Sequence, residues 1–329
     1  MHCFLSNGVV DCELELFIAQ CAEEGVRLVP MLSQLVKNMK WPKHVSAPST
    51  KCFTDSGSWT RGASELLSLY PVVRDFVVRV LPPDIAVPHR RSLLALFHVL
   101  DGYSVLQRGK KPKHWMVAMG KWLGLFKAAY PSFELRPKHH FCTHMEHQIN
   151  QHELLLSCFC LERRHKTFKG FASATTILNG FEKGVLLSMM NDHLRVMSDP
   201  KSLARGLYLD SPRAATQEFC DAMGASSILF SLEAYCRGVR SSAGDMVYVS
   251  RGNGYYVAEV LLHMNISGVF KVLARPYRLV ATTSTWQAMN EHIFVGIEYA
   301  LSSACWENCS NGRRVLLLPH LAYEANCHE

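Results

Sequence analysis

The sequence predicts an α+β protein in which a mainly α-helical region is followed by a small all-β, barrel-like domain. Up to about residue 235, apolar residues recur at three- and four-residue spacing, as they do on one face of a helix. From about residue 240 the pattern changes to alternating, β-branched segments that are typical of strands. We therefore expect three parts: helices and a loop over residues 1–60, helices over 61–235, and a β-rich domain over 240–320.

The helical part divides at loops that are rich in small and polar residues. Two helices are expected between Asp11 and Met39, and a loop over residues 40–62, which contains many Pro, Ser, Thr, Lys and Gly residues. Further helices are expected at 63–80, 88–106, 112–129, 138–152, around 160–169 and near 174–197. Their apolar stripes indicate core faces.

The β-rich domain is predicted from residues 244–280, which should contain three or four strands. Arg-Gly-Asn-Gly at 251–254 is typical of a hairpin turn, and Val315–Leu318 is a candidate for a last strand. The pattern leaves open whether this domain binds a peptide, a histone tail or nucleic acid, or only caps the helical region.

The hydropathy and the cysteine spacing indicate in which cellular compartment the protein is expected. No window contains 18 uninterrupted apolar residues, and the first residues lack a basic stretch followed by an apolar block. The twelve cysteines are irregularly spaced and include no CxxC pair, which favours reduced thiols over a disulfide framework. We expect a nuclear or cytoplasmic protein that is not secreted and has no membrane partner.

The positive charge is concentrated in one segment. Residues 101–170 hold twelve Lys and Arg against five acids, so the formal net charge of +7 arises there, together with seven of the sixteen histidines. The twelve cations are Arg108, Lys110, Lys111, Lys113, Lys121, Lys127, Arg136, Lys138, Arg163, Arg164, Lys166 and Lys169. Such a segment favours a polyanion partner such as DNA, whereas the plainer alternative is the solvated face of ordinary helices.

A histidine cluster occurs in PKHHFCTHMEH. On a helix over 138–150, His140, His144 and His147 would share one face, and an HxxxH pair can hold Zn²⁺ through two imidazoles. Two ligands make half a site, and the nearby thiols are those of Cys142, Cys158 and Cys160. Partly buried histidines with hydrogen-bond partners are the alternative.

A lone acid, Glu162, lies in the most basic stretch, SCFCLERRHKTFKGF. On a helix, Glu162, His165, Lys166 and Lys169 would lie on adjacent turns of one side. Two-metal enzymes that cut phosphodiesters gather carboxylates around Mg²⁺ or Mn²⁺, with basic groups beside them for phosphate. The alternative is an exposed ion pair with a neighbouring arginine, which contributes little to stability.

Four segments in sequence order carry a family resemblance: MHCFLSNGVV (1–10), GASELLSLYPVVRDFVVRVLP (62–82), RPKHHFCTH (136–144) and LLLSCFCLERRHKTFKGF (154–171). They resemble the C-terminal half of cut-and-paste DNA transposases of the CACTA (CMC-type) superfamily, over about residues 1–190. The first is similar to the stretch after the second catalytic Asp, and the second to a Thr-Ala-Ser-Glu-Trp helix. The third resembles an Asn-x-His-x-x-x-His helix, and the fourth the segment that leads to the catalytic Glu.

The resemblance implies an Asp-Asp-Glu active site on an RNase H-like core. Residues 1–60 would be the part of that core after the second Asp, and 61–235 a helical insertion with the final catalytic helix. Glu162 would be the catalytic carboxylate and a ligand of Mg²⁺ or Mn²⁺, and His140 and His144 would be a remnant zinc pair. Four cations would contact DNA: Arg163, Arg164, Lys166 and Lys169.

The sequence also departs from the family. The second Asp would lie two residues before Met1 and the first further upstream, so we expect a truncated transposase-derived chain without strand cleavage of its own. A gene-model artefact and a genuinely shortened protein both explain this. Expected partners are DNA, a second copy, or the missing N-terminal half. The alternatives are a non-catalytic DNA- or chromatin-binding protein domesticated from a transposon, and a helical interaction scaffold.

Overall fold

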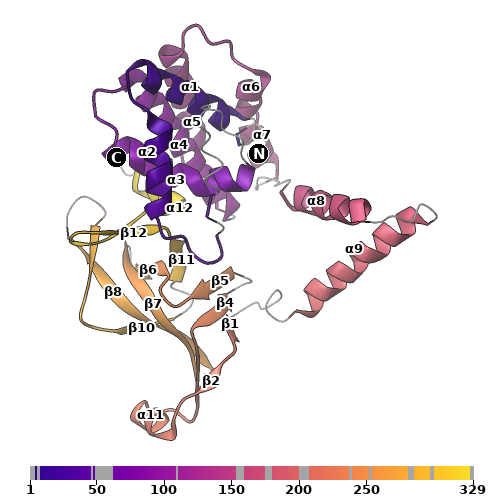
Figure 1. Cartoon of the computed structure of the whole chain (residues 1–329), viewed down its shortest axis with the longest axis vertical. Helices are drawn as coiled ribbons and strands as arrows, with labels where there is room; N and C mark the ends of the chain where they lie inside the picture. The colour runs from indigo at the N-terminus through magenta and orange to yellow at the C-terminus, as the bar shows by residue number, and fades with distance from the viewer. Residues whose placement is uncertain are drawn as a thin grey trace.

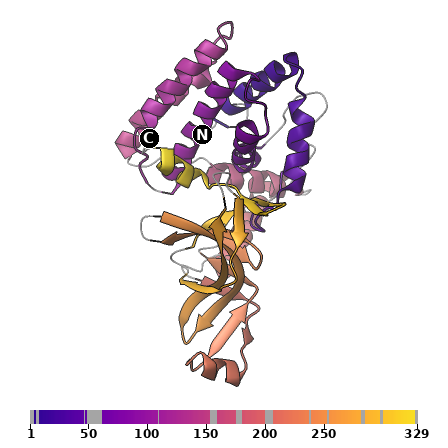
Figure 2. The same cartoon turned by 90° about the vertical axis from the view of Figure 1, so that its left-hand side faces the viewer.

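In the computed structural model, a helical bundle sits at one end of a curled antiparallel sheet, as Figures 1 and 2 show from two sides. The structure describes residues 4–5, 8–45, 47–48, 62–108, 110–152, 159–174, 180–199, 207–236, 239–251, 254–280, 285–296 and 300–326. At this coarse level the predicted α+β class is confirmed.

The bundle is built from the first part of the chain. Its helices are α1 (Val9–Glu23), α2 (Leu28–Asn38), α3 (Ala63–Arg79), α4 (Val87–Gln107), α5 (Trp115–Ala129), α6 (Pro137–Thr143) and α7 (Met145–His152). Local chemistry fixes several starts: the Glu65 carboxylate accepts the backbone N–H of Gly62 at 3.1 Å before α3, and Pro88 lies in the first turn of α4. The helices predicted at 63–80, 88–106 and 112–129 are confirmed within a few residues.

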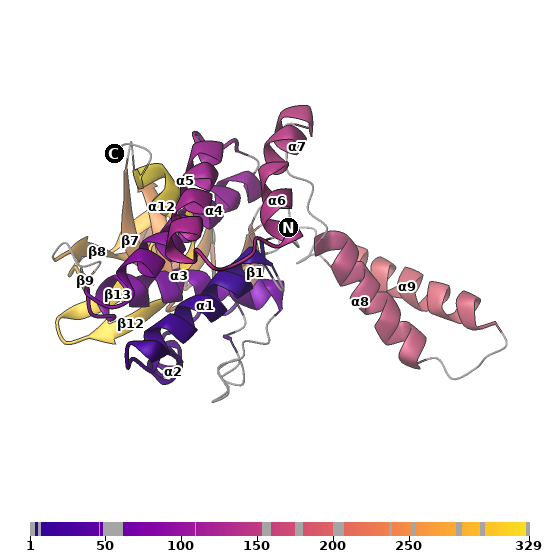
Figure 3. The same ribbon diagram turned by 90° about the horizontal axis from the view of Figure 1, so that it is seen from above.

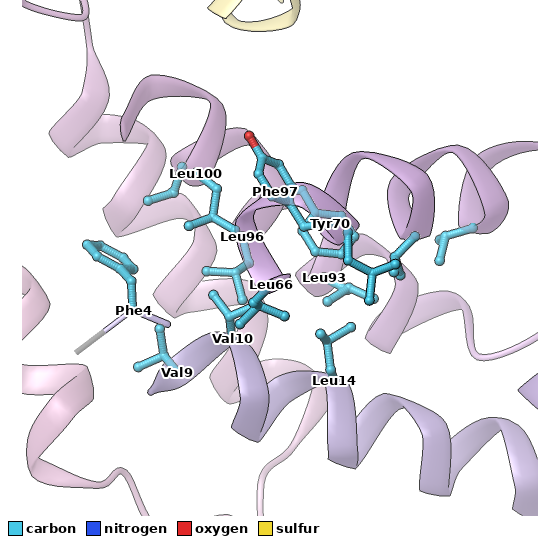
Figure 4. Close-up of a cluster of buried hydrophobic side chains, with 14 of the residues drawn as sticks. Phe4, Val9, Val10, Leu14, Leu66, Tyr70, Leu93, Leu96, Phe97 and Leu100 are labelled. Atoms are coloured by element: carbon cyan, nitrogen blue, oxygen red, sulfur yellow. The ribbon is translucent and has the colours of Figure 1, made fainter. Parts of the chain in front are cut away.

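One hydrophobic core holds the bundle together. Figure 4 shows Val10 and Leu14 of α1 close to Leu66 of α3 and to Leu93 and Leu96 of α4, all of them almost fully buried. Each such side chain contributes about 1.5–3 kcal/mol when it leaves water. Because this core includes residues from α1 and α2 as well as α3 to α5, the segments on the two sides of residue 60 pack as one unit.

Two further helices extend from the bundle. They are α8 (Phe159–Ala174) and α9 (Phe181–Ser198), and Figures 1 and 3 show them side by side as a hairpin that points away from the rest of the molecule. The helix expected around 160–169 is confirmed by α8. The helix expected from residue 174 begins later, at Phe181.

The strands pair antiparallel throughout the described part of the chain. They are β1 (Leu207–Asp210), β2 (Arg213–Ala214), β3 (Ile228–Ser231), β4 (Glu233–Cys236), β5 (Val239–Ser242), β6 (Met246–Arg251), β7 (Gly254–Ile266), β8 (Val269–Leu279), β9 (Thr285–Ala288), β10 (Ile293–Gly296), β11 (Ala300–Ala304), β12 (Trp306–Cys309) and β13 (Gly312–Val315). The larger sheet has the order β11-β6-β7-β8-β9-β13-β12, with β10 on β8, and β3 and β2 beyond β7. The smaller sheet has the order β1-β4-β5.

Two details of this region compare directly with the sequence pattern. The hairpin predicted at 251–254 is confirmed, since Arg251 of β6 pairs with Gly254 of β7. The strands begin at Leu207, ahead of the boundary expected near residue 240, and a short helix, α11 (Gln217–Ala222), lies among them. Strands of two to four residues are too short to show a clear period of two, so the sequence pattern misses them.

The end of the described chain returns to the bundle. Helix α12 (Pro319–Asn326) lies against α4, where the Tyr323 ring stacks on His98 with 4.7 Å between centroids. A backbone bridge also joins the two parts, because the N–H of Lys40 donates to the Trp306 carbonyl at 2.6 Å. In the described part of the chain, no helix is both long enough and apolar enough to cross a membrane.

Candidate nucleic-acid interface

The connection between α4 and α5 carries the densest group of described cations. Arg108, Lys110, Lys111 and Lys113 are all exposed, and the next exposed lysines, Lys121 and Lys127, follow on α5. No Asp or Glu occurs between Gly102 and Phe133. A surface with six cations and no acid in the same stretch has a positive potential that attracts phosphate.

Two histidines, the buried His320 and the half-buried His98, lie near these cations. Burial, and then the charges of Arg108 and Lys110, lower the pKa of His320 on α12 to about 4. Burial, and then the charge of Lys121, likewise lower the pKa of His98 on α4. The cations of the connection and of α5 therefore act on the same side of the bundle, where α4 and α12 pack together.

Helix α5 is held by its inner face, which leaves the lysines outside. The Trp115 indole N–H donates to the Val99 carbonyl at 2.7 Å, and the Trp122 indole N–H donates to Oε2 of Glu13, also at 2.7 Å. Both indoles are buried. Residues on the opposite side of α5 are exposed: Val117, Gly120, Lys121, Gly124, Lys127 and Ala128. The basic face therefore rests on a rigid helix.

The chain entering α5 is also fixed. His114 has a left-handed backbone (φ 55°), which costs energy in a residue other than glycine. Its carbonyl accepts the N–H of Ala118 at 3.0 Å, and the Tyr323 hydroxyl donates to the carbonyl of Lys113. These contacts hold the backbone between the lysines of the connection and those of α5.

Glu13 is a site residue of another kind, which the sequence pattern did not identify. It has no exposed surface, and burial raises its pKa to about 7 although the Trp122 indole stabilises the carboxylate. The apolar residues of α1, such as Leu14 and Phe17, mark its inner face. From the sequence pattern alone, a charged residue such as Glu13 is expected on the solvent-exposed face of the helix. Because burial raises its pKa, we expect the protonation of Glu13 to affect the stability of the bundle.

The predicted zinc pair, His140 and His144, does come together. Their Nε2 atoms lie 2.9 Å apart and their rings are perpendicular, with 4.6 Å between centroids. Tetrahedral Zn²⁺ with Zn–N bonds of 2.0–2.1 Å would set its two nitrogens about 3.3 Å apart, so a small movement of the rings would fit the ion. At 2.9 Å, one imidazole N–H instead donates to the other ring.

The remaining members of that cluster lie elsewhere. The single helix expected over 138–152 is broken, since α6 ends at Thr143 and α7 begins at Met145, with His147 exposed beyond the break. Cys142 is buried in the bundle core, and Cys158 and Cys160 lie outside the described side chains. Among the described residues, no group of three or more His, Cys, Asp or Glu could share a metal ion. The pair is therefore half a site.

His139 is buried, whereas the adjacent His140 is exposed. The His139 ring is buried against Trp122, Phe126 and Phe133, with 5.1 Å between the centroids of His139 and Phe126. Burial lowers the pKa of His139, which favours the neutral ring. Of the two adjacent histidines in PKHHFCTH, one therefore belongs to the core and the other to the surface.

The predicted catalytic helix has the expected backbone but not the expected surroundings. Glu162 and its basic neighbours lie on α8, which is helical from Phe159 to Ala174, and Lys169 is exposed. The side chains of residues 162–166 lie outside the described part. Figures 1 and 3 show α8 alongside α9 and not against either sheet. In these views helix α8 lies away from the described strands, and where the Glu162 side chain points is outside the described part of the structure.

The sheet contains a cluster that the sequence pattern did not reveal. The Glu259 carboxylate of β7 bonds Arg313 of β13 at 2.9 Å and accepts the Tyr277 hydroxyl of β8 at 3.1 Å. The Arg313 guanidinium also lies over the Trp306 ring, 4.2 Å from its centroid. Because these groups pair with one another across four strands, the cluster serves to hold the sheet.

Comparison with known proteins adds no relationship. No protein-family model and no curated protein sequence matches the chain.

Proposed function

We propose that this protein binds DNA through the basic face formed by the α4–α5 connection and the outer side of α5. The observation that carries the proposal is the set of six exposed cations over residues 108–127 with no acid between residues 102 and 133. Lys and Arg side chains bind the phosphate backbone and release its counterions, whatever the base sequence. The rigid support of α5 by its two buried indoles favours a preformed surface.

The evolutionary origin that we propose for this protein is based on the resemblance of its sequence to CACTA-type transposases. We propose a transposase-derived protein whose parent activity is DNA cleavage and strand transfer, with Glu162 as a ligand of Mg²⁺ or Mn²⁺ in the parent enzyme. Arg163, Arg164, Lys166 and Lys169 on α8 would add phosphate contacts. A nuclear location follows from a DNA partner.

The described residues do not complete a metal centre, so the proposed function does not depend on one. One carboxylate cannot hold two divalent ions in a cutting geometry, and the pair of His140 and His144 is half of a zinc site. The function proposed for this chain is therefore binding without cleavage.

The test is DNA binding by fluorescence anisotropy with a labelled duplex, in Mg²⁺ and in EDTA, for the wild type and Glu162→Gln. We expect tight binding at low salt that weakens as salt rises, with the same affinity for the wild type and Glu162→Gln within each buffer. Cleavage that needs Mg²⁺ and disappears in Glu162→Gln would instead support the enzyme alternative. Absence of binding at low salt would refute the proposal and favour the helical interaction scaffold.

A further inference from the structure

Helix α9 carries apolar side chains on two sides, and in the described part of the chain one of these sides is exposed. Val185 is almost fully buried, at 1% exposure, and α9 contacts α8. On another side of the helix, Leu187, Met190, Leu194 and Met197 are 48%, 52%, 56% and 51% exposed. At 100° per residue, these four positions lie about 120–200° around the helix from Val185. The second face therefore lies on the side of α9 opposite the buried Val185.

The spacing of the exposed face is that of a helix–helix seam. Residues 187, 190, 194 and 197 follow each other at intervals of three, four and three, which are the a and d positions of a heptad repeat. Such side chains pack as knobs into the holes of a facing helix, whereas a solvated helix face has no reason to keep this order. The seam therefore fits a helix of similar character.

The stripe is complementary to a second copy of itself. If two α9 helices pack antiparallel about a two-fold axis at residue 192, Leu187 faces Met197 of the second copy, and Met190 faces its Leu194. All four apolar layers are then filled on both sides. This is the isologous contact by which most homodimers form.

The charges of α9 permit the same arrangement. The positions that flank the seam, Leu186, Asn191, His193 and Ser198, include no Asp, Glu, Lys or Arg, so two identical surfaces meet without ion repulsion. Asp192 and Arg195 bond each other within the chain at 3.0 Å. A polyanion or a charged peptide has no counter-charge along this seam.

We propose that the chain self-associates through α9, with Leu187, Met190, Leu194 and Met197 forming the antiparallel seam of a homodimer. Figures 1 and 3 show the α8–α9 hairpin extending from the bundle, so two hairpins can meet as four helices while the two bodies stay apart. This inference does not rest on the proposed DNA binding.

The test uses opposite charges across the seam and sedimentation velocity over a wide range of protein concentration. Leu187→Glu and Met197→Lys each place a charge in one apolar layer of the seam. We expect each variant alone to weaken the dimer by on the order of a hundredfold. In an equal mixture, the carboxylate introduced in one chain would face the ammonium group introduced in the other, and a heterodimer should form again.

Controls separate the seam from other effects. Val78→Glu changes an apolar residue that is 52% exposed on α3, outside both the seam and the basic face, and it should leave the dimer intact. A wild type that is monomeric at every concentration would overturn the proposal. So would a mixture that stays monomeric while both single variants keep their helical circular dichroism, because that result excludes the antiparallel register.

Discussion

The basic face can be tested through the salt dependence of DNA binding. Lys110→Gln, Lys111→Gln and Lys113→Gln together remove three of the six exposed cations of the face and keep side chains of similar length. Each phosphate neutralised by a cation contributes about −0.9 to the slope of log K against log salt. We therefore expect the slope of the triple variant to be smaller in magnitude by about 2.7.

This change is large enough to measure by anisotropy titrations. Over a fourfold increase in salt, a difference of about 2.7 in slope corresponds to an affinity loss that is about 40-fold greater for the wild type than for the variant. The fold should survive, because exposed substitutions change stability by about 0.5 kcal/mol or less. The contact between Tyr323 and the Lys113 carbonyl is made to the backbone and is retained.

A matched control makes the result specific to the face. Arg27→Gln, Lys37→Gln and Lys40→Gln remove three exposed cations beside and within α2, so the net charge falls by the same amount. The reasoning is refuted if the control changes the slope as much as the triple lysine variant does. An unchanged slope in the lysine variant would equally show that DNA is bound elsewhere.

Three further predictions concern the bundle. Folded Glu13 holds its proton up to about pH 7, whereas the unfolded chain ionises near the ordinary pKa of 4.5, so the free energy of unfolding should fall by on the order of 3 kcal/mol as pH rises through this window. Urea titrations of Glu13→Gln should show a smaller fall than the wild type, because burial also raises the pKa of Asp101 to about 7 and Asp101 titrates in the same window. Asp101→Asn leaves Arg74 without its buried counter-charge and should cost about 3 kcal/mol by the same assay. Gly102→Ala places a methyl group into the Trp115 ring and should lower the Tm by several degrees in thermal unfolding.

Each of these has an outcome that would count against it. A wild type and Glu13→Gln that lose stability in parallel between pH 4.5 and 7 would show that this carboxylate is not the titrating group. An Asp101→Asn protein as stable as the wild type would mean that Arg74 reaches water in the folded state. A Gly102→Ala protein with unchanged Tm would mean that the indole of Trp115 can move aside.

The helices of the bundle were predictable because each has a long apolar stripe. For α3, α4 and α5 the periodicity runs over four or more turns, and Pro88 or Glu65 marks a start. The prediction of a single helix over 138–152 was wrong at one point, because α6 ends at Thr143 and α7 begins at Met145. A break of one residue leaves the apolar spacing nearly unchanged, so the pattern cannot detect it.

The sequence predicted which segment carries the positive charge, but it predicted only some of the positions that the site residues take in the fold. Counting cations located the basic segment, and the proximity of His140 and His144 follows from helical spacing. The burial of Glu13 could not be predicted, because it depends on the Trp122 indole, a partner 109 positions away in sequence. The position of α8 beside α9 likewise depends on tertiary packing that no local pattern records.

The contact of α12 with α4 has a consequence for how the molecule is made. Tyr323, which stacks on His98 and bonds the carbonyl of Lys113, leaves the ribosome long after the helices that it secures. The lysine-bearing connection is therefore fixed only once residue 323 has left the ribosome. If the basic face binds DNA as proposed, a nascent chain should present that face in its final form only after the strands have been made.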